Sequence, residues 1–250
     1  MTSGDPSDKR RLYQQILEHP GKKAENRWNS LSRIHRVMRA NEADLLSLID
    51  RLRQEPKVAL AVMSDVTLQD TRIRDAFFDE VIRTSHNYLS ALKMLVEHTR
   101  NLMRHYQGTP FHEEYTSRVL TLVAGGRGPL LRKLRDYLIH YRVPPFGTVV
   151  ELGQDIPLEM IVCLDRNAAL EYPDWSRAAR EYLEQQPDQI PLTDLIRGYA
   201  SDLEQVYNWL YEQFPSLHGA EIAEVNEMII GLQGAGNTPG HPDYHPPHPM

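Results

Sequence analysis

The stretch TRIRDAFFDEVIRTSHNYLSALKMLVEHTRNLMRHY, residues 71–106, decides the fold class. Its large apolar side chains recur at the period of one face of an α-helix. They are Ile73, Phe77, Val81, Tyr88, Leu92, Leu95, Leu102 and Met103. The cluster Gln107-Gly108-Thr109-Pro110 then predicts the end of this helix. A long helix with one apolar stripe needs neighbours that cover the stripe, so the stretch predicts a bundle of long antiparallel helices.

The same helical pattern continues on both sides of this stretch. A second long helix is expected over residues 24–55, where Trp28 and Leu31 begin the apolar stripe and Pro56 ends it. Shorter helices are expected over residues 111–123, 129–142, 175–185, 192–214 and 220–232. Two β-rich runs within residues 147–165, separated by Gly153 and Pro157, predict a β-hairpin. The predicted fold class is therefore mainly α, a helical bundle with one small β-hairpin insertion.

The domain organisation follows from where the apolar stripes begin and end. Residues 1–23 are expected to form a partly helical N-terminal segment, and residues 24–232 a single helical domain whose C-terminal helices cover residues 175–232. Residues 233–250 are rich in Gly, Pro and His and are expected to be disordered. Histidines in this tail could bind a metal, but a solvated tail is favoured because the prolines prevent a helix from aligning them.

Composition and charge restrict the class of protein. The chain is 41% hydrophobic and 25% charged, as in ordinary globular proteins. It has no apolar run of about 20 residues, and the start MTSGDPSDKRRLYQQ lacks the apolar segment of a signal peptide, so we expect a soluble cytoplasmic protein without membrane association. Cys163 lies in an apolar run and is expected to be a buried, inert thiol.

The net charge of −6 is unevenly distributed: residues 1–142 carry +7 and residues 143–250 carry −13. The basic part could bind a polyanion. The sequence contains no phosphate-binding loop of the Gly-x4-Gly-Lys type, no dinucleotide-binding glycine pattern and no His-Glu-x-x-His. We therefore expect no cofactor and no metal site in the helical domain. The loop before Pro129 could direct backbone N–H groups and Arg127 at a phosphate, with a plain helix connection as the competing interpretation.

Two segments match the pattern Arg-x4-His, and one of them has the better chemical context. In the run from Arg135 to His140, Asp136 precedes the histidine by one helical turn, so its carboxylate could orient the imidazole. An arginine and a histidine that converge on a phosphodiester could supply a cation for the developing negative charge and a general acid or base, without a metal. The second match contains the secondary candidates Arg100, Asn101 and His105.

The run Leu134-Arg-Asp-Tyr-Leu-Ile-His-Tyr-Arg-Val-Pro144 resembles the Arg-polar-x3-His signature of the HEPN superfamily. These are small helical bundles, and many are RNases of toxin–antitoxin and antiviral systems. A wider likeness, over residues 78–214, is to a group of uncharacterised bacterial proteins, and it is carried by residues 86–90, residues 95–100, the Arg135 motif and residues 207–210. The resemblance implies a HEPN-like core at about residues 71–142 and a homodimer that brings two motifs together. It also implies catalytic roles: His140 as general acid/base, Arg135 as phosphate ligand, and Asp136 as the group that holds the histidine.

The local charge around the motif is basic and favours RNA as a partner. Candidate phosphate contacts, apart from the motif itself, are Arg127, Arg132, Lys133 and Arg142. A structural alternative is that His140 and Arg142 only favour the C-terminal end of a helix dipole. In that case the chain is a non-catalytic dimerisation or interaction protein that binds a protein partner, such as an antitoxin or a complex subunit. A third hypothesis is a nucleic-acid-binding module without cleavage.

Overall fold

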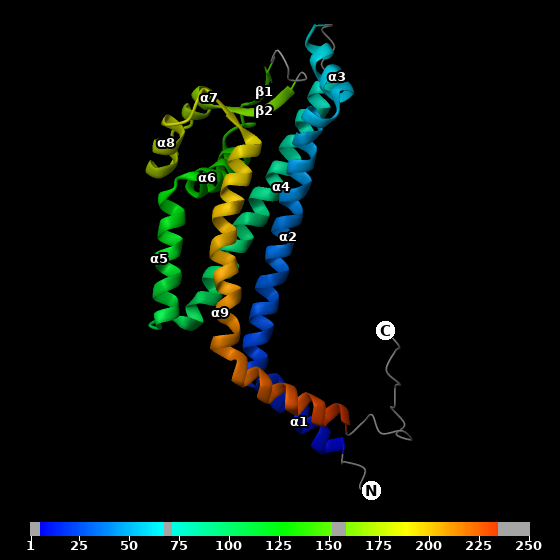
Figure 1. The fold of residues 1–250 in the computed structure, drawn as a ribbon, viewed down its shortest axis with the longest axis vertical. Coiled ribbons are helices and arrows are strands. Elements are labelled where there is room, and N and C mark those ends of the chain that lie inside the picture. The colour runs from blue at the N-terminus through cyan, green and yellow to red at the C-terminus, as the bar shows by residue number, and fades with distance from the viewer. Residues whose placement is uncertain (1–5, 68–71, 152–158, 235–250) are drawn as a thin grey trace. The chain divides into compact units, whose positions relative to one another are not determined.

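A computed structural model describes residues 6–67, 72–151 and 159–234 and confirms a mainly α fold (Figure 1). The elements in chain order are α1 (Pro6–Glu18), α2 (Pro20–Gln54), α3 (Pro56–Thr67), α4 (Arg72–Met103), the 3₁₀ helix η1 (Arg104–Tyr106), α5 (Pro110–Ala124), α6 (Arg127–His140), β1 (Phe146–Glu151), β2 (Glu159–Asp165), α7 (Arg166–Leu170), α8 (Arg177–Glu184), β3 (Gln189–Pro191) and α9 (Leu192–Gly234).

Proline marks the first residue of several helices. The helices α1, α2, α3 and α5 all begin with this residue. Its fixed φ angle suits the first turn, where an N–H group would have no helical partner. Pro56 does end α2, as expected, but it also begins α3, a helix that the apolar pattern did not predict.

The chain divides into two compact units, residues 33–207 and a smaller unit of residues 1–32 with 208–250. In the smaller unit, the buried Trp28 of α2 lies against Phe214 of α9, with ring centroids 4.7 Å apart. Gly21 allows close approach of the backbones, because a Cβ atom there would lie 2.2 Å from the carbonyl oxygen of Glu221. The separate expectation that residues 24–232 unfold as one cooperative domain remains a prediction.

The helix α9 is continuous through Pro215, whereas the sequence predicted two helices with a break after Phe214. That expectation was wrong. Proline removes one backbone hydrogen bond and usually interrupts a helix. Here the ring of Phe214, next to the proline, packs on Trp28, so tertiary packing stabilises the turn that proline weakens.

The core of the larger unit contains the predicted stripe of α4. Phe77, Val81, Tyr88, Leu92, Leu95, Leu102 and Met103 are buried. Ile73, at the start of the helix, is the exception and is 52% exposed. The stripe is covered by neighbours that include α9, as the buried hydrogen bond of 2.5 Å between the hydroxyl groups of Thr99 and Tyr207 illustrates. Burial of this apolar face is the main stabilising contribution of the helix.

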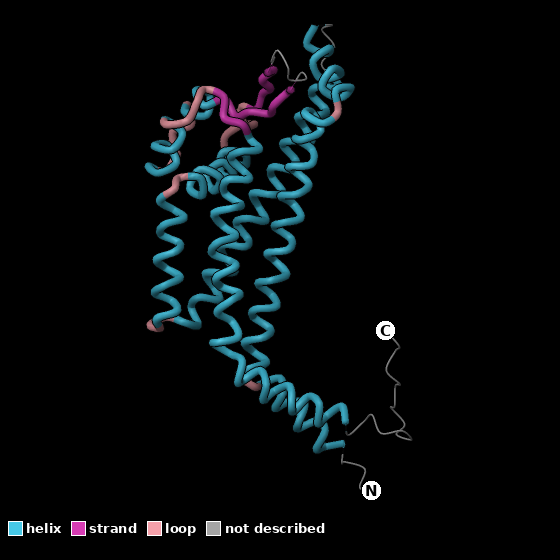
Figure 2. The backbone as a smooth tube through the Cα atoms, in the orientation of Figure 1, coloured by secondary structure: helices cyan, strands magenta, loops and turns pink. Residues whose placement is uncertain are grey.

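The predicted hairpin is present as β1 and β2, antiparallel with Val149 opposite Ile161, and Figure 2 shows these strands in magenta. Cys163 is buried in β2, as expected. The sheet also has a third strand, because β3 pairs with the end of β2, with Ile190 opposite Leu164. The sequence did not predict β3, since three residues that end in proline carry no recognisable alternation.

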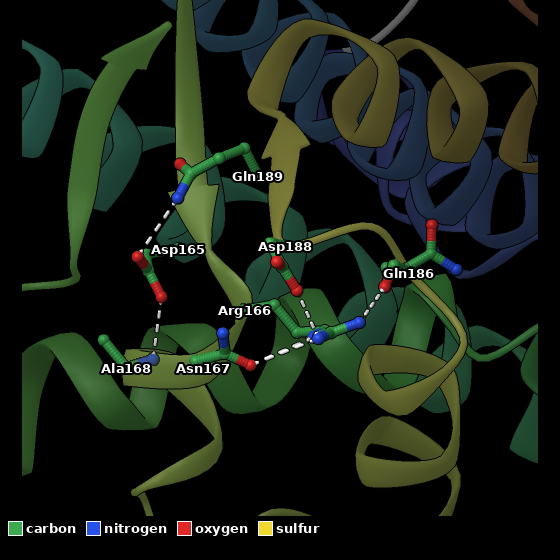
Figure 3. A network of polar contacts seen from close by, with 7 residues as sticks. All are labelled: Asp165, Arg166, Asn167, Ala168, Gln186, Asp188 and Gln189. Carbon is green, nitrogen blue, oxygen red and sulfur yellow. Dashed lines mark hydrogen bonds and ion pairs between the residues drawn. The ribbon is translucent and has the colours of Figure 1, made fainter.

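A polar network joins the end of β2 to α7 and to the segment before β3 (Figure 3). The Asp165 carboxylate caps α7 by accepting a hydrogen bond of 2.8 Å from the backbone N–H of Ala168, and it accepts a second, of 3.1 Å, from the side chain of Gln189. The neighbouring Arg166 pairs with Asp188 and donates to the carbonyl of Gln186. These bonds fix the third strand and, through α7, the loop that borders the candidate site.

Replacement of Asp165 by alanine is expected to lower the free energy of unfolding by about 1 kcal/mol, the usual contribution of a helix cap. The hydrogen bond from Ala168 is the main cause of a lowered Asp165 pKa. A lowered folded-state pKa stabilises the protein above the unfolded-state value, and this is lost as pH falls through the folded-state pKa. Urea titrations of wild type and Asp165→Ala should therefore show a difference in unfolding free energy that shrinks as pH falls below about 4. A constant difference down to about pH 2 would contradict this assignment.

Two further expectations concern the ends of the chain and the membrane. Of the tail expected to be disordered over residues 233–250, Gln233 and Gly234 instead end helix α9, and residues 235–250, including His241, His245 and His248, lie outside the described residues. Among the helices that are described, none combines the length and the apolar character needed to cross a bilayer.

Candidate functional site

The helix α6 carries the Arg-x4-His motif, and its amphipathic pattern fixes which residues face outward. Four large side chains of this helix are buried: Leu130, Leu131, Leu134 and Tyr137. The opposite face presents Lys133, Asp136 and His140, which are three and four residues apart and therefore neighbours on one side of the helix. Arg135 lies at the edge between the two faces and is half-buried.

Arg135, Asp136 and His140 line one open depression on the surface of the larger unit. Lys93 of α4 and Lys133 of α6 lie in the same depression, together with the loop Tyr172-Pro173-Asp174-Trp175 between α7 and α8. The structure therefore brings together the three residues of the proposed catalytic motif. It does not seal them beneath the acidic C-terminal helices, because His140 is exposed to solvent.

Aromatic packing holds the C-terminal end of α6 in place. Tyr137 is fully buried and stacks on Trp175, with ring centroids 5.9 Å apart and planes inclined by 20°. It also meets the ring of Tyr172 edge-on at 5.2 Å. The indole N–H of Trp175 donates a hydrogen bond of 2.8 Å to the carbonyl of Ala169. These rings form a packed support, so the last turn of α6, including His140, has a defined position.

The carboxylate of Asp136 is directed at two cations rather than at the imidazole. Its Oδ1 atom lies 3.3 Å from Nη1 of Arg135, and its Oδ2 atom lies 3.7 Å from Nζ of Lys133. Among the described residues, His140 has no such contact with Asp136 or with any other side chain. The hypothesis that Asp136 orients the histidine is therefore not what this geometry favours: the carboxylate positions Arg135.

Arg135 retains hydrogen-bonding capacity beyond this contact. Its Nε atom is buried and has no hydrogen-bond partner within the described part of the chain. A guanidinium carries five N–H donors. The contact with Asp136 engages Nη1, so Nη2 is the nitrogen left, within the described part of the chain, for a ligand that enters the depression.

Arg142, a predicted phosphate contact, has structural partners instead. Its Nε atom donates to the Tyr137 hydroxyl at 2.7 Å, and its Nη2 atom contacts the Glu171 carboxylate at 2.5 Å and the Ala168 carbonyl at 3.1 Å. The hydrogen bond to Tyr137, followed by that to Glu171, raises the pKa of Arg142. The side chain ties the end of α6 to α7, and these bonds would compete with a phosphate.

The remaining predicted phosphate contacts lie in different surroundings. Arg127 pairs with Asp202 of α9 at 3.0 Å and packs against Gly198, where a Cβ atom would meet its Cζ atom at 2.9 Å. Lys133 lies in the depression, as described above. Arg132 is exposed on the same helix and lines a separate, more enclosed cavity. Of the four predicted contacts, only Lys133 lies in the depression with the motif.

The second Arg-x4-His match does not assemble in the same way. Arg100 pairs with Glu97 at 2.9 Å and lines the enclosed cavity. Asn101 and His105 are exposed, and neither lines that cavity or the open depression. The structure thus separates the members of this match, while it brings Arg135 and His140 together.

The sequence did not identify every residue of the depression. Lys93, Tyr172 and Asp174 carry polar groups there and were not predicted as site residues. They come from α4 and from the loop after α7, far from the motif along the chain. No spacing rule relates such positions. The one available signal was the aromatic enrichment around Trp175, which packing in the core explains equally well.

The depression combines cationic side chains with an exposed imidazole. Lys93, Lys133 and Arg135 are cations, and Asp136 and Asp174 are the carboxylates in the depression. Imidazole is the side chain that exchanges a proton most readily near neutral pH, and His140 presents it to solvent. In the described parts of the chain, no group of three or more His, Cys, Asp or Glu side chains could hold a metal ion. No family model, curated protein or solved structure matches this chain.

Proposed function

We propose that the chain is a metal-independent endoribonuclease of HEPN type. The observation that carries the proposal is the convergence of Arg135 and His140 in one solvent-accessible depression with Lys93 and Lys133. An open depression with a net positive charge suits the phosphate backbone of RNA. Contacts between cationic side chains and phosphates release bound counterions, and this release contributes a large part of the affinity of nucleic-acid complexes. The exposed imidazole has the freedom to approach a bound phosphodiester.

The proposed reaction uses the RNA as its own nucleophile. An imidazole accepts the proton of the 2′-hydroxyl while the 2′-oxygen forms a bond to phosphorus. The bond between phosphorus and the 5′-oxygen breaks, and an imidazolium returns a proton to that oxygen. Arg135 stabilises the negative charge that develops on the phosphoryl oxygens. The products are a 2′,3′-cyclic phosphate and a 5′-hydroxyl, and no water or metal is consumed.

We also propose that the active form is a homodimer, in line with the resemblance to HEPN proteins, since two copies of the motif would supply both the base and the acid. Such an activity would suit a toxin or a defence effector that is held in check by a protein partner. Light scattering should then give twice the chain mass of 28.9 kDa at micromolar concentration. A mass that stays at 28.9 kDa across that range would contradict the dimer.

The test is cleavage of a mixed-sequence RNA by purified protein in excess EDTA. We expect cleavage to survive EDTA, and we expect the products to end in 2′,3′-cyclic phosphate. The matched control is the same RNA with 2′-O-methyl groups, which lacks the nucleophile and should remain intact. Cleavage of the methylated RNA, or complete inhibition by EDTA, would refute this mechanism.

A second candidate function is RNA binding without cleavage, and one observation favours it. Arg135 is half-buried and already paired with Asp136, so it is less available to a transition state than a fully exposed arginine. In that case the protein would bind RNA with an affinity that falls as salt rises. Binding of several RNAs, with no cleavage of any of them, would select this alternative.

A further inference from the structure

A second cavity, of about 260 Å³, lies among α4, α5, α6 and α9 within the larger unit. Its wall is mostly apolar and includes Leu92 and Val96 of α4, Val119 and Leu122 of α5, and Val206 of α9. Figure 1 shows α5 and α6, in green, beside the yellow part of α9. The cavity is distinct from the open depression, although Lys93 and Asp136 border both.

Polar groups at this cavity are placed as in a ligand site. Only 5% of the surface of Tyr199 is exposed. Its ring packs against Gly128 at the start of α6. Tyr199 lines the cavity, and its hydroxyl has no hydrogen-bond partner among the described residues. Burial raises the pKa of Tyr199 to about 12, so the group is a neutral donor at physiological pH. A ligand carboxylate that enters the cavity could accept a hydrogen bond from this hydroxyl.

Two cations without counter-ions border the same cavity. Lys93 and Arg132 are exposed at its mouth and form no ion pair with any described residue. The third cation there, Arg100, is paired with Glu97, and the second carboxylate, Asp136, is paired with Arg135 and Lys133. The charge that remains for a ligand is therefore positive.

We propose that this cavity binds a medium-chain carboxylate, with its hydrocarbon chain among the apolar side chains and its carboxylate at Arg132, Lys93 and the Tyr199 hydroxyl. The apolar wall favours a hydrocarbon, and the uncompensated cations favour an anion over a neutral or cationic head group. Binding at this cavity does not require the proposed ribonuclease activity, although Lys93 borders both the cavity and the open depression.

The volume of the cavity sets the length of the ligand's hydrocarbon chain. An apolar cavity of about 150 Å³ accommodates benzene, so 260 Å³ corresponds to a ligand of roughly ten carbon atoms. Decanoate is therefore the probe of choice. Decan-1-ol has the same chain without the charge, and decylamine has it with the opposite charge.

Isothermal titration calorimetry of the full chain with the three probes is the first test. Decanoate should bind about tenfold more tightly than decan-1-ol, and decylamine should bind more weakly than both. Equal affinity for the three probes would overturn the assignment of the head group. Absence of binding by any probe at concentrations up to about 1 mM would overturn the site itself.

Matched variants locate the binding. Val119→Trp fills the cavity from α5 and should weaken decanoate binding by about tenfold or more. Leu120→Trp places the same side chain at a neighbouring position that is 63% exposed and outside the cavity, and it should bind as wild type. Arg132→Gln should lower the affinity for decanoate about fivefold and leave the affinity for decan-1-ol unchanged. The matched control is Arg33→Gln, because Arg33 is an exposed arginine on α2 outside the cavity, and it should change neither affinity. Unchanged decanoate affinity in Val119→Trp would overturn the proposal even if wild type binds.

Discussion

Replacement of His140 by alanine is expected to lower the rate of RNA cleavage about a hundredfold or more, because the variant loses the proposed proton-transfer group. Arg135→Ala should lower it by a similar factor, because the developing phosphoryl charge loses its cation. Initial rates in EDTA measure both effects. His140 is exposed and has no side-chain partner in the described structure, so His140→Ala should keep the helicity and melting temperature of wild type.

The chain supplies its own control, because the second Arg-x4-His match has the same residue types in a different place. His105→Ala and Arg100→Ala remove an exposed histidine and an exposed arginine that do not line the open depression. Both variants should cleave RNA as wild type does. Equal cleavage by wild type and His140→Ala would indicate a contaminating nuclease, and loss of activity only in His105→Ala would move the site to the second match.

Asp136→Asn separates the two roles considered for this carboxylate. Because Asp136 contacts Arg135 and Lys133, its replacement should act mainly through the position of Arg135. We therefore expect a lower rate of cleavage, because Arg135 would be less well placed to stabilise the phosphoryl charge, while the proton transfer itself is unaffected. The dependence of the cleavage rate on pH, measured at saturating RNA, should keep the form it has in wild type if the carboxylate does not orient the histidine.

The long helices could be predicted because their apolar residues repeat with a helical period, as the buried Phe77, Tyr88 and Leu95 of α4 illustrate. Two features of the fold could not be predicted from this period, because they depend on tertiary contacts. The continuity of α9 through Pro215 accompanies the packing of Phe214 on Trp28, which is distant in sequence. Strand β3 exists only by pairing with the end of β2. Local propensity was a poor guide at both positions, since packing overrides it.

The candidate site was predictable to the extent that it lies on one helix. Positions 133, 136 and 140 share one face of α6 by helical geometry alone, so sequence spacing predicts that these three side chains are neighbours. Partners on other elements do not follow from it. The contacts of Arg142 with Ala168 and Glu171, and the presence of Lys93 beside the motif, arise from the packing of α4, α6 and α7.

Gly126→Ala is expected to destabilise the larger unit by several kcal/mol, through two separate effects at the residue that precedes α6. The residue has φ of +77°, where a side chain costs about 1–2 kcal/mol. A Cβ atom would also lie 2.7 Å from the Cβ atom of Tyr182, which is fixed to the backbone of α8. Such overpacking costs about 1–3 kcal/mol more. Chemical denaturation monitored by circular dichroism measures the sum.

Gly108→Ala isolates the first effect, because Gly108 has nearly the same φ of +79° and nothing lies within 4 Å of the position that an alanine methyl group would take there. It should cost only the backbone strain, so the difference between the two variants reports the clash with Tyr182. Tyr182→Ala should then recover part of the stability lost in Gly126→Ala, since the methyl group gains space, although the Cβ contact itself remains. Equal destabilisation by the two glycine variants would mean that α8 shifts to accommodate the methyl group at position 126 without a measurable cost in stability. The position of α6, and with it the motif that it carries, would then not depend on that contact.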